Sequence, residues 1–185
     1  MKKPVTSIRP AELRDAAAIA RVHIRSWQVA YRGQLSDAFL NGLDAEIDQR
    51  TSRWEGFIAA RTSRGQVYLV AQNGDRVVGF VTFGPSEDEP VDPRIGEVYA
   101  IYVDPSYWDR GYGRALFTAA MRGLSDAGFG EATLWVLGTN ARARRFYEIA
   151  GWAADGAVKT EHRGDIELRE VRYRRAPLKD GSAQS

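Results

Sequence analysis

The sequence predicts a single α/β domain, built on a mixed and mostly antiparallel sheet with one central parallel strand pair. The 185 residues suit one domain. Hydrophobic residues make up 44% and charged residues 27%, as in an ordinary globular protein. Segments with strand and helix patterns alternate along the chain. We expect the domain over residues 1–176 and a flexible C-terminal tail over 177–185, because the last residues are small and polar.

The first half of the chain predicts a strand, two helical regions and a hairpin. The segments are a strand at 5–9, a helix at 12–31, a helical region at 36–60, and strands at 66–72 and 77–83. Apolar residues recur at helical spacing in both helical regions, and Val29 and Phe57 are among them. Asn73-Gly74-Asp75 is a hairpin turn. The acidic segment 84–94 contains three prolines and predicts a loop.

The second half adds a crossover unit and a final pair of strands. The segments are strands at 96–103 and 132–137, helices at 113–127 and 140–150, and strands at 152–159 and 166–174. Gly128 and Gly151 follow the two helices as C-cap candidates. A strand, a helix and a second strand in this order place the two strands in parallel. The remaining strands are joined by short turns and are therefore antiparallel.

The composition excludes several kinds of site. The chain has no cysteine, which excludes disulfides, thiolate metal sites and a cysteine nucleophile. Only His23 and His162 are histidines, so we expect no metal centre. No run of about 18 apolar residues occurs, and the first residues lack the apolar core of a signal peptide. We therefore expect a cytoplasmic protein without a membrane partner.

The charge pattern argues against nucleic acid as a partner. Lys and Arg number 26, Asp and Glu number 24, and the two signs are interleaved along the chain. A nucleic-acid footprint needs basic residues clustered on one face. We expect no nucleic acid, and an arginine-based nucleic-acid-binding protein stays as an alternative hypothesis.

A glycine turn is the most informative part of the sequence. The segment Asp109-Arg110-Gly111-Tyr112-Gly113-Arg114 follows one predicted strand and opens a helix. The first amides of a helix have no intrahelical partner, and glycine lets a ligand approach the backbone closely, so a pyrophosphate suits the turn. Arg110 and Arg114 can add charged contacts. Leu116 replaces the third glycine of a dinucleotide fingerprint, and the lysine of a P-loop is absent. The alternative is a tight strand–helix connection without a ligand.

Two stretches resemble motifs of the GNAT superfamily of acyl-CoA-dependent N-acyltransferases. Residues 97–105 and 108–116 resemble its coenzyme A motif, Arg/Gln-x-x-Gly-x-Gly/Ala, with Trp108 where Arg or Gln is commonest. Residues 134–148, followed by Gly151-Trp152, resemble its next strand and helix. The resemblance implies a fold in which the two parallel strands splay apart, with helices on both faces of the sheet. It also implies acetyl transfer from acetyl-CoA to a primary amine.

The resemblance also implies where the cofactor binds. The pantetheine arm would pair with the end of the first parallel strand, and the pyrophosphate would sit on the amides of the glycine turn. Residues of the next helix would complete the site, although Asn140 is also an ordinary N-cap. The cofactor-binding residues implied are Ile101, Tyr102, Val103, Asp109, Arg110, Gly111, Tyr112, Gly113, Arg114, Asn140 and Ala143.

Acetyl transfer needs a base and an acid. An alkylammonium has a pKa of about 10 and must lose a proton before it attacks, and the departing thiolate needs a proton. By resemblance, Tyr147 is the general acid, and the alternative is a packed aromatic. Glu97 is the base, acting directly or through a water, and burying it in an apolar strand is costly. The alternative is a solvent-exposed charge at the strand entry. Some relatives place a glutamate on the next strand, where this chain has Trp135.

The acceptor stays open among antibiotic, polyamine, amino acid and protein N-terminus. Trp27 and Tyr31, with nearby His23 and Trp54, predict an aromatic acceptor pocket, or else part of the core. The acidic residues 87–89 either steer a cationic acceptor or form a solvated loop. A small-molecule amine or a peptide N-terminus is the expected partner, and a homodimer is possible. A coenzyme A-binding regulatory module without turnover is the alternative function.

Overall fold

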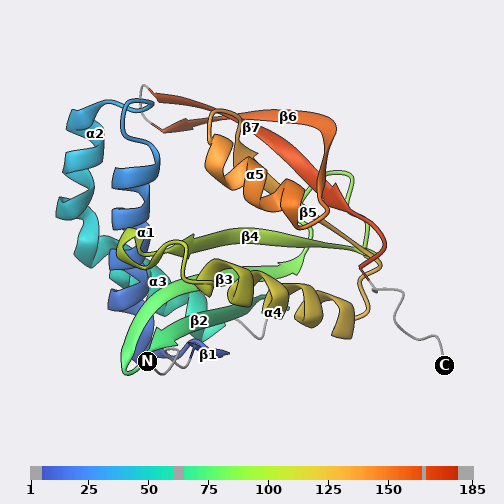
Figure 1. Cartoon of the computed structure of the whole chain (residues 1–185), viewed down its shortest axis with the longest axis horizontal. Coiled ribbons are helices and arrows are strands. Elements are labelled where there is room, and N and C mark those ends of the chain that lie inside the picture. The colour runs from blue at the N-terminus through green and yellow to red at the C-terminus, as the bar shows by residue number, and fades with distance from the viewer. Residues whose placement is uncertain (1–5, 61–64, 164–165, 179–185) are drawn as a thin grey trace. The chain divides into compact units, whose positions relative to one another are not determined.

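The computed structural model describes residues 6–60, 65–163 and 166–178 (Figure 1). Its strands form one seven-stranded sheet in the order β1-β2-β3-β4-β5-β7-β6. The strands are β1 (Thr6–Pro10), β2 (Val67–Asn73), β3 (Arg76–Pro85), β4 (Ile95–Val103), β5 (Glu131–Leu137), β6 (Ala153–Arg163) and β7 (Ile166–Arg175). β4 and β5 are parallel, and β2 pairs antiparallel with β1 and β3, as β7 does with β5 and β6. The predicted mixed sheet with a parallel pair is confirmed.

The helices fall where the sequence places them. The predicted region 36–60 is broken into α2, a 3₁₀ turn and α3, and Ser36 caps α2 by accepting a hydrogen bond from the Phe39 amide at 3.2 Å. The helices are α1 (Ala16–Ala30), α2 (Asp37–Gly42), α3 (Ile47–Ala60), α4 (Tyr112–Asp126) and α5 (Ala141–Ile149), with 3₁₀ turns at Leu13–Asp15, Leu43–Glu46 and Pro105–Tyr107. No helix in the described ranges is long and apolar enough to cross a membrane.

The backbone contacts divide the chain into two compact units. The first contains the described residues up to Phe83 together with Ala100–Ala120. The second contains Gly84–Tyr99 and the described residues from Met121 onward. β4 and α4 each contribute residues to both units.

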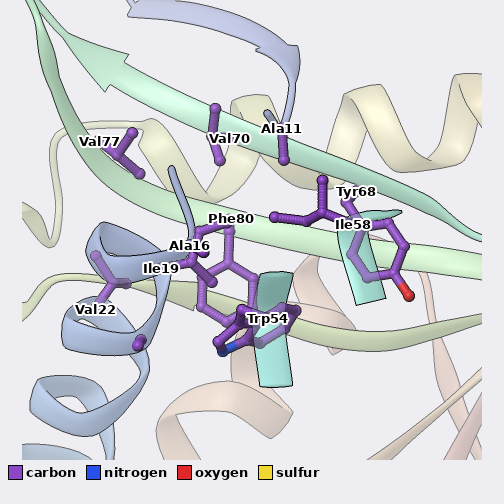
Figure 2. Packing of buried hydrophobic residues seen from close by; sticks show 11 residues of the cluster. Ala11, Ala16, Ile19, Val22, Trp54, Ile58, Tyr68, Val70, Val77 and Phe80 are labelled. Atoms are coloured by element: carbon purple, nitrogen blue, oxygen red, sulfur yellow. The ribbon is translucent and has the colours of Figure 1, made fainter. Parts of the chain in front are cut away.

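The first unit has an aromatic core. Trp54 of α3 packs edge-on against Phe80 of β3, with ring centroids 5.0 Å apart, and Ile19 and Val22 of α1 lie in the same cluster (Figure 2). Aromatic residues bury large apolar areas, so such a cluster stabilises the packing of helices on strands. Two apolar residues of the predicted helical faces are not part of this core, because Val29 is 50% exposed and Phe57 is 43% exposed. Helical spacing assigns a residue to a face but does not reveal how much of that face a neighbour covers.

The second unit holds the paired start of the parallel strands. Ile95–Val98 pair with Glu131–Leu134, and within the described strands the pairing does not continue to Tyr99 and Trp135. Gly96 leaves little room for a side chain, because a Cβ at this position would lie 2.6 Å from Leu124 Cδ2 and 3.1 Å from Phe129 Cγ.

The C-terminal residues are described only in part. Leu178, which the sequence analysis assigned to the tail, is buried, and its N–H donates to the Gly130 carbonyl at 3.0 Å. Residues 179–185 lie outside the described residues, and the tail and the domain limits stay predictions.

Candidate functional site

The glycine turn of the first unit has an unusual backbone. Asp109 has φ +60° and Gly111 has φ +88°, two left-handed residues within three positions. α4 begins at Tyr112, and the Ala115 amide donates to the Gly111 carbonyl at 3.0 Å. The amides that precede Ala115 belong to the first turn of the helix, whose N–H groups have no acceptor within the helix. Together with the positive end of the helix dipole, this turn suits an anion.

Two arginines flank this turn. The side chains of Arg110 and Arg114 are exposed. The Arg110 guanidinium lies 5.3 Å from the ring centroid of Tyr107. Neither residue is buried in the core, so both remain available for charged contacts with a phosphate.

The end of β4 is anchored through Val103. Its carbonyl accepts hydrogen bonds from Ser26 Oγ at 3.0 Å and from the Trp108 indole N–H at 2.7 Å. Trp108 therefore donates its indole N–H to the end of the strand. An Arg or Gln, the commonest residues at this position of the motif, would present a different polar group. The Tyr102 carbonyl faces β3 closely, since a Cβ on Gly79 would lie 2.9 Å from it.

The aromatic residues expected around the acceptor are in the interior of the first unit. Trp27 and Tyr31 are both buried, with ring centroids 4.9 Å apart. The Trp27 indole N–H donates to Tyr102 Oη at 3.0 Å, and the His23 ring lies 4.8 Å from the Tyr102 ring. These contacts are those of packed core residues. An acceptor-binding role for Trp27 and Tyr31 stays a prediction.

Glu97 is a buried carboxylate in the second unit. Glu97 is 7% exposed. Its Oε2 accepts hydrogen bonds from Ser86 Oγ at 3.2 Å and from the Glu87 amide at 3.0 Å. Burial raises the pKa of Glu97 above its ordinary value, and the two hydrogen bonds oppose that shift only in part. The structure thus buries the residue that the alternative hypothesis placed in solvent.

The loop that holds Glu97 is itself fixed by Asp88. The Asp88 amide donates to Ser86 Oγ at 3.2 Å, while its carboxylate accepts from the Trp135 indole N–H at 2.9 Å and from Arg172 at 3.0 Å. The nearby negative charge of Asp88 adds to the raised pKa of Glu97. The acidic loop was expected to be solvated or to steer a cationic acceptor, but Asp88 is half-buried and hydrogen-bonded to Trp135 and Arg172.

A lysine lies on the other side of Trp135. Lys159 Nζ is 4.5 Å from the Trp135 ring centroid, a cation–π contact. Its positive charge lowers the pKa of Glu97, opposing burial and Asp88. The sequence named Asp88 only as part of an acidic loop and gave no sign of Ser86 or Lys159, because no local pattern links these residues to Glu97.

The start of α5 is capped by Asn140. Asn140 Oδ1 accepts a hydrogen bond from the Ala143 amide at 3.1 Å, which is the ordinary N-cap arrangement. The cofactor contacts expected of Asn140 and Ala143 stay predictions.

Tyr147 lies further along α5 in a well-fixed environment. Its side chain is buried, and its ring centroid is 6.1 Å from that of Tyr173. Arg144 joins this helix to its surroundings by donating to Tyr173 Oη at 3.1 Å and to the Gly138 carbonyl at 3.0 Å. The hydroxyl of Tyr173 in turn donates to Glu148 at 2.6 Å. These contacts fix the helix that carries Tyr147.

Known proteins resemble this chain in sequence and in fold. The sequence matches the Acetyltransferase (GNAT) family over residues 24–152. The uncharacterized N-acetyltransferase YuaI of Bacillus subtilis is 33% identical over 74% of this chain and 74% of its own length. The mycothiol acetyltransferase of Rhodococcus erythropolis is 38% identical over 58% of this chain, and the match spans 35% of that protein.

The solved structures agree on the fold. The PaiA N-acetyltransferase of Thermoplasma acidophilum, in complex with coenzyme A, has a TM-score of 0.70 and 18% identity, covering 92% of this chain and 98% of its own. YncA of Salmonella typhimurium, solved with its cofactor acetyl-CoA, has a TM-score of 0.67 and 20% identity, covering 97% of this chain and 98% of its own. With the sequence match over most of its length, this chain belongs to the GNAT family of acetyltransferases.

Proposed function

We propose that this protein transfers an acetyl group from acetyl-CoA to the primary amine of a small molecule or a peptide N-terminus. The observation that carries the proposal is the buried Glu97, whose carboxylate is held by Ser86 and the Glu87 amide and whose pKa is raised by burial. A buried carboxylate with a raised pKa is a stronger base than an ordinary one, which suits it to accept a proton from the acceptor. Family membership supplies the reaction class.

The glycine turn is the proposed binding site for the diphosphate of acetyl-CoA. The amides of Tyr112, Gly113 and Arg114 open α4, and the left-handed Gly111 shapes the turn before them. Binding of coenzyme A by relatives of the same fold supports this assignment. The Val103 carbonyl already has two donors and the Tyr102 carbonyl faces β3, so we expect the pantetheine arm to pair mainly with the backbone of Ile101.

The proposed chemistry uses one base and one acid. Acetyl-CoA supplies an electrophilic thioester carbonyl and a thiolate leaving group. Glu97 accepts a proton from the acceptor ammonium, directly or through a water, and the freed amine forms the new C–N bond as the C–S bond breaks. Tyr147 gives its phenolic proton to the departing sulfur, because a phenol and a thiol have pKa values close enough for that transfer. The new amide must lose a second N–H proton, which restores the Tyr147 phenol directly or through solvent, and Glu97 releases its own proton to solvent.

An acceptor panel tests the proposal. Thiol release from acetyl-CoA is measured with polyamines, amino acids, aminoglycoside antibiotics and a peptide with a free N-terminal alanine. The panel includes such a peptide because one structural relative is a ribosomal-protein-S18-alanine N-acetyltransferase. We expect turnover with at least one amine. Tight acetyl-CoA binding without thiol release for any amine would instead support a regulatory module.

A further inference from the structure

The first compact unit contains a basic groove that none of the proposed acetyl-transfer residues line. Its volume is about 540 Å³, and its walls come from the end of β1, the 3₁₀ turn before α1, α1 as far as Arg25, the β2–β3 turn and Asp104 (Figure 1 locates the helix and strands). A concave volume of this size lies in the range of small-molecule sites and exceeds what one inorganic ion fills. The groove therefore has room for an organic ligand.

Positive charge dominates the groove. Five arginines line it against three aspartates, which leaves a formal excess of two positive charges. Two of the aspartates are already neutralised, because Asp15 pairs with Arg9 at 2.6 Å and Asp104 pairs with Arg25 at 3.1 Å. Asp75, in the β2–β3 turn, forms no ion pair with any residue that the structure describes. The remaining arginines are Arg14, Arg21 and Arg76.

Two of these arginines carry the argument. Arg21 of α1 and Arg76 of β3 are exposed, and among the described residues neither makes a hydrogen bond, ion pair or ring contact. Arg14, by contrast, is paired with Glu12 at 2.9 Å. A guanidinium presents a planar fork of donors that matches phosphate and carboxylate oxygens. Arg21 and Arg76 bring two positive charges, unpaired within the described part of the chain, to the same groove, and two charges are best balanced by a ligand that carries more than one negative charge.

We propose that this groove binds a small molecule that carries two or more phosphate groups, at a site separate from the acetyl-transfer site. Arg21 and Arg76 contact the phosphates, and the concave walls next to Val22 and Val77 accept the organic part of the ligand. The paired Arg9 and Arg25 contribute to the positive potential but are held by their aspartates. The inference does not depend on the proposed function, because no residue of the glycine turn lines the groove.

The test is a calorimetric titration with ADP and with inorganic pyrophosphate as probes. It is done with coenzyme A present at saturation, so that the proposed diphosphate site on the glycine turn is filled. The double variant Arg21→Ala/Arg76→Ala is compared with Arg53→Ala/Arg122→Ala, which removes the same charge from exposed arginines that do not line the groove. All four side chains are exposed, and thermal melting checks that both doubles fold.

We expect ADP to bind the wild type, and the groove variant to weaken that binding at least about tenfold, the loss expected from two charge-assisted contacts. The control double variant binds ADP within about twofold of the wild type, and both double variants bind coenzyme A within about twofold of the wild type. No binding of either probe, or an equal loss in both doubles, would overturn the site. A short oligonucleotide is titrated in the same way, and if it binds more tightly than ADP and depends on the same arginines, the ligand class is overturned. If coenzyme A itself fails to bind, the proposed function fails, and the same titration without it still tests the groove.

Discussion

The indole N–H of Trp135 donates a hydrogen bond to Asp88 Oδ1 at 2.9 Å, which ties β5 to the loop that holds Glu97. The link continues through the Asp88 amide to Ser86 Oγ, and from Ser86 to the Glu97 carboxylate at 3.2 Å. Trp135 occupies the position where some relatives carry a glutamate. In this chain, Trp135 instead holds Asp88, and through Asp88 and Ser86 it fixes the loop that donates hydrogen bonds to Glu97 on the neighbouring strand.

The charges around Glu97 predict two opposite pH shifts. Burial is the main cause of its raised pKa, Asp88 adds to it, and Lys159 opposes it. Asp88→Asn keeps an oxygen for the Trp135 indole but removes the charge, so the rising limb of kcat/KM against pH moves to lower pH. Lys159→Ala moves the same limb to higher pH. The measurement is the pH–rate profile over about pH 5–9. Shifts in the same direction for both variants would show that Glu97 does not set this limb.

Loss of the Tyr147 hydroxyl tests the acid. Tyr147→Phe keeps the buried ring, so the melting temperature changes little, while kcat falls about 10²–10³-fold because the thiolate leaves without a proton. Phe146→Leu, a change on the same helix, is the control and leaves kcat within about threefold. Steady-state kinetics on both variants make the comparison. Equal kcat values for Tyr147→Phe and the wild type would leave Tyr147 as a packing residue.

Gly111 tests the proposed diphosphate turn against a matched glycine. Gly111 and Gly128 have φ +88° and +92°, and a Cβ on either meets no atom within 4 Å. Alanine at each position costs about 1–2 kcal/mol of backbone strain, so the two variants lose similar stability. Only Gly111→Ala raises the KM for acetyl-CoA. A similar KM increase for both variants, or for neither, contradicts the assignment of the turn.

The Arg9–Asp15 pair predicts an acid-sensitive contribution to stability. Burial alone would raise the pKa of Asp15, but the bidentate hydrogen bonds from Arg9 and the Glu12 amide outweigh it and lower that pKa below 3.8. The stabilisation is therefore present above that value and is lost as the pH falls through the folded pKa. Asp15→Asn lowers the free energy of unfolding by about 2–3 kcal/mol at pH 7.

Urea unfolding at neutral and at acidic pH checks this dependence. The difference between Asp15→Asn and the wild type narrows as the pH falls below 3.8 and through the lowered pKa of folded Asp15, because protonation of the carboxyl removes the ion pair from the wild type. A difference that stays constant with pH would show that the ion pair does not contribute.

Local sequence patterns were enough to predict the helices, the strands and the Asn140 cap, because each of these depends on residues close in sequence. The loop at Ser86–Asp88 was misread for the opposite reason. Asp88 is bonded to Trp135 and Arg172, 47 and 84 residues away, and a short acidic segment gives no sign of such partners. The same holds for the basic groove, whose arginines are scattered between Arg9 and Arg76 and gather only in the fold.

Glu97→Gln tests the central claim most directly, because it carries two independent readouts. Glutamine cannot accept a proton, so thiol release with the best acceptor falls by at least about 10²-fold while coenzyme A still binds. The raised pKa means that ionised Glu97 costs stability as the pH rises above its ordinary value of 4.5, so the variant melts at a higher temperature than the wild type near neutral pH and loses that advantage near pH 4. We predict lost turnover with gained stability; unchanged thiol release in a protein that binds acetyl-CoA would contradict the account.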